Sequence, residues 1–172
     1  TPGLADFVAK LISIQRAELQ LFPWMMFAIY EAIVYSYRFE LAYLNPAGIY
    51  GVSEVRGGDQ DNKLIGVDFI FRIPKLKAYI SLYVDDWDLG RPFSLTYYHN
   101  EWAGILGFQL YELLPALSLQ LEYIRVSHWM YTHTASFADE AHNFNRYVHF
   151  DSHLGHFLNP NSHMIYLRAA YD

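Results

Sequence analysis

The sequence contains no cysteine, which excludes disulfides, thiolate metal sites and cysteine nucleophiles. It also has no window of about 18 consecutive apolar residues, so no transmembrane helix is predicted. The longest apolar run, from Phe22 to Tyr30, is too short and contains Pro23. The chain carries a net charge of −6 and no run of Lys or Arg, so nucleic acid is not an expected partner.

Aromatic side chains are abundant in this chain of 172 residues. It holds 15 Tyr, 12 Phe and 4 Trp, and this exceeds what one small core usually needs. Aromatic belts at the two interfaces of a membrane would use such a load. The chain begins Thr1-Pro2-Gly3 without a signal peptide, so we expect a mature segment or a fragment rather than a whole precursor.

The segment from Asn62 to Trp87 predicts a β-hairpin with two unlike faces. Its side chains alternate in character, and a period of two indicates strand rather than helix. One face would carry Ile65, Val67, Phe69, Phe71, Ala78, Ile80, Leu82 and Val84. The other would carry Gly66, Asp68, Arg72, Lys77, Tyr79, Ser81, Tyr83 and Asp85, with Ile70 as the exception. An outer-membrane barrel needs this arrangement, with lipid on one side and a wet lumen on the other.

The same alternation predicts further strands on both sides of this hairpin. We expect them from about Leu11 to Phe22, from Met25 to Tyr35, in a second hairpin from Glu101 to about Trp129, and from His163 to Tyr171. The first pair would turn at Phe22-Pro23-Trp24. A break of phase at Ile124 and Arg125 predicts a bulge or a strand that leaves the bilayer.

The connections between these strands are asymmetric. Pro74 and Pro115 mark short turns at one end, whereas long polar segments join the strands at the other. Transmembrane barrels have short periplasmic turns and long extracellular loops. We therefore predict an all-β fold, an antiparallel transmembrane β-barrel with long loops and a possible short helical element, within one unit of residues 1–172. About seven strands are counted and eight is the minimum for small bacterial barrels, so the chain would be part of a larger barrel.

Several motifs occur in an order that is typical of one family. They are Glu31-Ala32-Ile33-Val34-Tyr35, Tyr43-Leu44-Asn45-Pro46, Gly58-Asp59-Gln60-Asp61-Asn62, Gly66-Val67-Asp68-Phe69, Val84-Asp85-Asp86, Trp129-Met130-Tyr131-Thr132-His133 and Leu154-Gly155-His156-Phe157-Leu158-Asn159-Pro160-Asn161. Over about residues 11 to 171 the chain resembles the carboxy-terminal part of the Wzi-like capsule assembly family, which more often has Gly where Asn159 stands. The resemblance implies an outer-membrane β-barrel of a Gram-negative bacterium that holds capsular polysaccharide at the cell surface. It implies no catalytic residues.

Histidines and carboxylates are the residues that could carry metal chemistry or catalysis. His149, His153 and His156 would suit a metal on a helix, but Gly155 and Pro160 argue against one. On an extended segment, residues four apart lie roughly 13 Å apart, too far for one ion. Asp85 and Asp86 would point to opposite faces of a strand. We therefore predict no metal site and no cofactor.

A glycosidase would need two strand carboxylates to converge, and the candidates are Glu31, Asp68 and Glu122. Charges in the lumen of a barrel are expected without any catalysis, so we predict that the protein is not an enzyme. The predicted polar residues of the lumen are Glu31, Asp68, Arg72, Lys77 and Glu122.

Glycan binding fits the loop residues better, because aromatic faces with flanking polar groups are suited to sugars. The predicted lectin-like contacts are Trp87, Tyr97, Tyr98, Trp102, Trp129, Tyr131, His133, Tyr147, His156 and Asn159. An equally open alternative is that these rings form an interface girdle or pack within the loops. A general outer-membrane channel, a soluble β-sandwich or lipocalin-like binder and an envelope glycosidase are the alternative functions.

Overall fold

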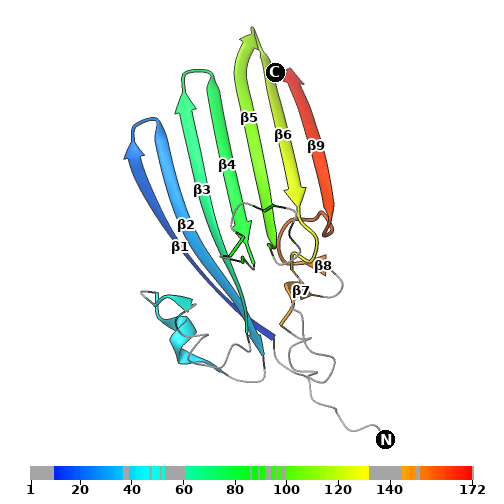
Figure 1. Cartoon of the computed structure of the whole chain (residues 1–172). Coiled ribbons are helices and arrows are strands. Elements are labelled where there is room, and N and C mark those ends of the chain that lie inside the picture. The colour runs from blue at the N-terminus through cyan, green and yellow to red at the C-terminus, as the bar shows by residue number, and fades with distance from the viewer. Residues whose placement is uncertain are drawn as a thin grey trace, which may run out of the picture.

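The computed structural model describes residues 10–36, 39–46, 48–50, 52, 61–85, 87–88, 90–91, 94–95, 97, 100–131, 145–149 and 152–171. Its main feature is one antiparallel sheet of seven strands in the order β1-β2-β3-β4-β5-β6-β9 (Figure 1). The strands are β1 Lys10–Phe22, β2 Met25–Ser36, β3 Asn62–Ile73, β4 Leu76–Val84, β5 Trp102–Leu114, β6 Leu117–Val126 and β9 Ser162–Tyr171. The predicted all-β class and the number of strands in this sheet are confirmed.

Three smaller elements lie at the end of the sheet where the long connections are (Figure 1). A 3₁₀ helix, η1, covers Leu41–Leu44, and β7 (Val148–His149) pairs with β8 (Ser152–His153) in a two-stranded sheet. None of the helices in the described ranges has the length and apolar character needed to cross a membrane.

Proline begins each of the short turns at the opposite end of the sheet. Each of Pro23, Pro74 and Pro115 directly follows the last residue of a strand. The next strand begins two residues after the proline. Proline holds φ near −65° and cannot donate to the ladder, so it ends the pairing. Lys75 and Ala116 complete two of these turns with φ of 66°. All three turns agree with the sequence prediction.

The pairing register divides the seven strands into two faces. Residues directly opposite one another in an antiparallel pair point to the same side. Val67 lies opposite Ile29 and Leu82, and we call this side the aliphatic face. Asp68 lies opposite Ala28 and Ser81, and we call this side the polar face.

The register corrects the predicted position of Glu31. Glu31 lies opposite Ile65, so it belongs to the aliphatic face and not to the face of Asp68 and Glu122. The reason is that β2 is apolar on both sides near its end, where Ala32, Ile33 and Val34 are all buried. The alternation of polar and apolar residues therefore could not show which face Glu31 occupies. The other four predicted polar residues of the lumen share the polar face: Asp68, Arg72, Lys77 and Glu122.

The irregularity expected in β6 lies elsewhere. The pairing of β5 with β6 is continuous from Ala103–Val126 to Leu110–Leu119, so Ile124 and Arg125 form no bulge. The register shifts instead between Leu110 and Leu114 of β5. Ile124 is apolar on the polar face because that part of the face is covered, as described below.

Two hydrophobic clusters cover the loop end of the sheet, one on each face. On the aliphatic face, Ile33 and Tyr35 pack with Tyr43 and Tyr50 of the segment that contains η1. On the polar face, residues 127–131, 145–149 and 152–161 pack on the sheet, and we call them the plug. The plug cluster consists of Tyr30, Ala32, Val34, Leu64, Ala103, Val126, Met130, Tyr131 and Tyr147.

Away from these clusters the aliphatic face is open in the described part of the chain. Its exposed members include Ile29, Ile65, Ile80, Leu82, Leu106, Phe108, Leu110, Leu121, Tyr123, Ile165 and Leu167. Ile165 and Leu167 of β9 are 71% and 70% exposed. Within the described ranges β1 and β9 each pair on one side only, so this sheet does not close on itself.

Tyrosines lie over glycines at two positions of the polar face. Tyr30 of β2 is opposite Gly66, and Tyr79 of β4 is opposite Gly107. A Cβ at either glycine would overlap with the tyrosine ring. Each glycine therefore lets a tyrosine ring pack directly on the backbone of the next strand. This contact offsets the packing that a glycine without a side chain would otherwise lose.

Substituting these two glycines by alanine is expected to have unequal effects. Tyr30 is 8% exposed and cannot move aside, so Gly66→Ala should lower the free energy of unfolding by about 1–3 kcal/mol, as overpacking does. Tyr79 is only partly buried, so Gly107→Ala should cost less than about 1 kcal/mol. Urea unfolding of both variants in detergent micelles measures the difference. Equal losses would contradict the ring packing described here.

Candidate functional site

Polar side chains form a continuous strip on the polar face, across four neighbouring strands. Tyr79 of β4, Gly107 of β5, Glu122 of β6 and Tyr166 of β9 lie in one cross-strand row. The next row toward the short turns consists of Lys77, Gln109, Gln120 and Arg168. We call these two rows the polar lane.

Hydrogen bonds tie the centre of the polar lane together. The Tyr79 hydroxyl donates to Glu122 Oε1, and Gln120 Nε2 donates to the same oxygen at 2.9 Å. Gln120 Nε2 also lies 3.3 Å from the Tyr79 hydroxyl. The Lys77 ammonium lies 5.0 Å from the centroid of the Tyr79 ring, a cation–π contact. The group therefore presents a phenol, a carboxylate, an amide and an ammonium in fixed relative positions.

A shallow cavity of about 210 Å³ lies at the end of the polar lane nearest the short turns. Gln109, Tyr111, Gln120 and Arg168 line it. Their side chains supply both donors and acceptors, as a ligand rich in hydroxyl groups requires. The sequence analysis missed Gln109, Gln120 and Arg168, although Gln120 has the same strand phase as the predicted Glu122.

A second cavity of about 240 Å³ lies between the sheet and the plug. Tyr83 and Ile124 line it from the sheet, and Tyr131 and His156 from the plug. His156 N donates to the Tyr131 hydroxyl at 3.1 Å, and His156 Nδ1 accepts from Leu158 N at 3.1 Å. The second bond requires a deprotonated Nδ1.

Two of the predicted glycan contacts are buried in the plug instead of being exposed. Tyr131 and Tyr147 are 2% and 3% exposed. The Tyr147 hydroxyl lies 2.7 Å from the carbonyl oxygen of Ala32 and 3.1 Å from that of Asn62. Tyr131 N donates to Asp85 Oδ2 at 3.1 Å. These contacts hold the plug against the sheet, as in the packing alternative considered for the loop rings.

The remaining predicted contacts are dispersed. Trp129 and Asn159 are exposed, and Asn159 Oδ1 lies 3.2 Å from His153 Nε2. Trp102 is partly buried on the aliphatic face, where its Nε1 donates to Leu95 O at 3.2 Å. Trp87 and Tyr97 are partly buried. Tyr98 and His133 lie outside the described residues.

A second polar group lies on the same face beside the plug. Arg16 Nη1 of β1 lies 2.6 Å from Asp68 Oδ2 of β3, and the Arg16 guanidinium is 5.3 Å from the centroid of the Tyr30 ring. The pair reaches across β2, with Asp68 buried and Arg16 exposed, and Arg16 also pairs with Glu18. This ion pair links β1 to β3 across β2.

The carboxylates do not converge as a glycosidase pair would. Glu31 is on the opposite face from Asp68 and Glu122. Asp68 and Glu122 are three strand spacings apart, about 14 Å along the sheet, whereas glycosidase carboxylates are roughly 5–10 Å apart. In the described part of the chain, no group of three or more His, Asp or Glu side chains is placed to hold a metal.

Comparisons with protein families, with curated proteins and with solved structures find no match for this chain.

The plug should weaken in mild acid through His156. Burial lowers the pKa of His156 below its usual 6.5, and the charge of Glu122 opposes this shift only in part. Because the unfolded chain then binds the proton more tightly, the stability contributed by this site is present above pH 6.5 and is lost as the pH falls through the lower folded pKa. Protonation also removes the acceptor for Leu158 N.

Urea midpoints at pH 7.5 and pH 5.5 measure this loss. Wild type should lose more stability between the two values than His156→Gln, whose side chain does not titrate. His163→Gln is the control, because His163 is exposed on the aliphatic face and should lose as much as wild type. An equal loss in wild type and His156→Gln would exclude His156 as the titrating group.

Proposed function

We propose that the protein is a non-enzymatic, Wzi-like outer-membrane protein of a Gram-negative bacterium that binds surface or capsular polysaccharide and supports its attachment or assembly. Its sheet would belong to a transmembrane β-barrel, with the aliphatic face toward lipid and the polar lane toward the lumen. Further strands beside β1 and β9 would complete the barrel.

The observation that carries this proposal is the exposed aliphatic face of the sheet, which has a polar face opposite it on β3 to β6 and β9. A soluble sandwich would bury its aliphatic face against a second sheet, and no such layer is present in the described ranges. An apolar surface of this extent in contact with water would be an aggregation liability, whereas lipid accepts it.

The polar lane supports the polysaccharide part of the proposal. Sugar hydroxyls both donate and accept, and the lane combines a carboxylate, amides, phenols and an arginine on four adjacent strands. Arg168 and Lys77 add positive charge at one end, which would suit the acidic sugars common in capsules. The plug covers the polar face on the side of the lane that faces the long connections. A polysaccharide chain would therefore lie across the strands and would not pass along the lumen.

Membrane partitioning of the full-length parent, expressed in Gram-negative cells with its own signal peptide, is the first test. We expect the protein in the outer-membrane fraction and resistant to carbonate extraction, because its apolar face would be in the bilayer. Recovery in the soluble fraction as a monodisperse protein without detergent would overturn the barrel proposal.

Binding of surface polysaccharide, purified from the cells that make the protein, tests the second part. Arg168→Gln should weaken binding about tenfold, which matches the loss of one charge-assisted hydrogen bond of about 1.5 kcal/mol. Arg125→Gln is the matched control, because Arg125 is a strand arginine on the aliphatic face. Equal affinities for wild type and Arg168→Gln would place the glycan elsewhere. Solute conductance in planar bilayers without glycan binding would favour a general channel instead.

A further inference from the structure

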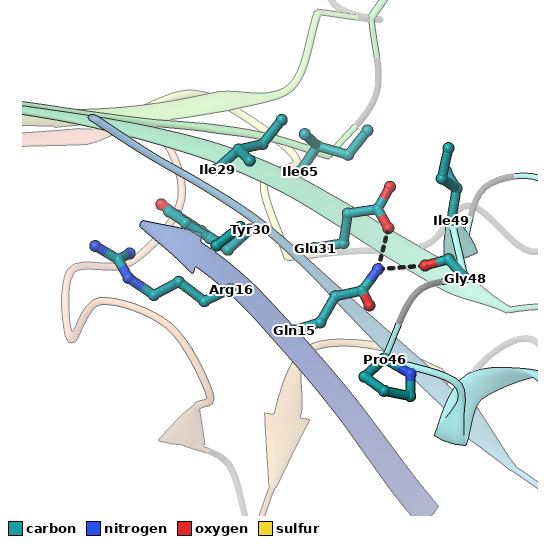
Figure 2. Close-up of a pocket in the computed structure, with 10 residues that line it drawn as sticks. Gln15, Arg16, Ile29, Tyr30, Glu31, Pro46, Gly48, Ile49 and Ile65 are labelled. Carbon is teal, nitrogen blue, oxygen red and sulfur yellow. Dashed lines mark hydrogen bonds between the residues drawn. The ribbon is translucent and has the colours of Figure 1, made fainter. Parts of the chain in front are cut away.

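Glu31 lies in a cavity of about 430 Å³ on the aliphatic side of the sheet, at its loop end (Figure 2). The cavity is formed by β1, β2 and β3 together with Pro46, Gly48 and Ile49. Ile29, Ile49, Ile65 and Ala17 make most of its wall. Arg16 also borders it, but its guanidinium is directed to the other face, where it pairs with Asp68.

The Glu31 side chain is 9% exposed and is only partly satisfied. Its Oε2 accepts from Gln15 Nε2 at 2.8 Å and from Tyr50 N at 3.0 Å. The other carboxylate oxygen points away from Gln15 (Figure 2). Among the described residues, no Lys, Arg or His forms an ion pair with Glu31.

Gln15 is a neutral neighbour of this carboxylate. Its Nε2 uses both hydrogens, toward Glu31 and toward Gly48 O at 2.6 Å. Its Oε1 is buried and has no hydrogen-bond partner. Gln15 and the Tyr50 amide therefore give Glu31 two neutral donors and no positive charge. The cavity therefore lacks a donor that carries positive charge.

The apolar wall of the cavity favours a ligand that also has an apolar part. Ile29 and Ile65 are partly exposed and continue into the open aliphatic face toward Val67 and Leu82. A flexible alkyl chain leaving the carboxylate would lie along these side chains. The volume is within the range of small-molecule pockets, about 300–1,000 Å³.

We propose that this cavity binds an amphiphile with a primary ammonium head and an alkyl chain. The ammonium would donate to the free oxygen of Glu31, and the chain would pack on Ile29 and Ile65. An alcohol would leave the negative charge of Glu31 uncompensated, and an anionic head would be repelled by it. The site is on the opposite face from the polar lane, so it does not rest on glycan binding.

The competing account is that Glu31 only holds Tyr50, and through Gln15 also Gly48, against the sheet. A titration with hexylammonium distinguishes the binding site from this competing account. NMR shifts of the Tyr50 and Gly48 amides report binding to the protein in neutral detergent micelles. We expect saturable shifts with hexylammonium, and none with hexyl sulfate or hexanol. Methylammonium should bind at least tenfold more weakly, because each buried methylene contributes about 0.8 kcal/mol.

Glu31→Gln should raise the Kd for hexylammonium at least tenfold, since it removes the charge and keeps an acceptor for Gln15. Glu18→Gln is the matched control, because Glu18 is an exposed carboxylate on the other face of β1. Ala17→Phe keeps Glu31 and fills the cavity, so it should also abolish binding, even if Glu31→Gln loosens the fold.

Three results would overturn the proposal. They are the absence of saturable hexylammonium binding, equal binding of hexyl sulfate, and an unchanged Kd in Glu31→Gln. Polysaccharide binding to the Glu31→Gln protein is measured in parallel. It should be retained, so a failure of the ammonium site is distinguishable from a failure of the proposed function.

Discussion

The register of the six antiparallel pairings is the constraint on which the rest of this structure depends. Because side chains alternate with a period of two, a slip of one residue in any pair would move the whole polar set of a strand to the other side. The register places Gly66 and Gly107 under tyrosines and brings Glu122 beside Tyr79. The polar lane therefore exists only in this one alignment of the strands.

Most of the sheet could be predicted from the sequence, because its strands are amphipathic and its turns contain proline. Pro74 and Pro115 separate arms with a clear alternation, and the structure has the strands there. The prediction failed for Glu31, where β2 is apolar on both faces and alternation carries no phase. Only the pairing with Ile65 assigns Glu31 to a face. The sequence of one strand does not determine how that strand pairs with its neighbour.

The candidate site was less predictable than the fold, for a related reason. The plug has no regular period, so nothing in the sequence distinguishes a buried tyrosine such as Tyr147 from one that is exposed for binding. Rings that were expected to meet a glycan turn out to fill the space between the plug and the sheet. Conversely, Gln109, Gln120 and Arg168 become a group only when β5, β6 and β9 are aligned. Gln109 and Gln120 belong to one hairpin, but Arg168 is 48 positions further along the chain, and the three belong to no recognisable motif.

The contact of Lys10 with the plug has a consequence for the order in which the chain assembles. The Lys10 ammonium donates to the carbonyl oxygens of Arg146 and Val148, which are more than 130 positions away. Each hairpin of the sheet can form from neighbouring segments, whereas this contact closes a loop that contains six of the seven strands. Contacts with such a large sequence separation are slow to form. The plug would therefore dock onto the sheet only after strands β1 to β6 have paired.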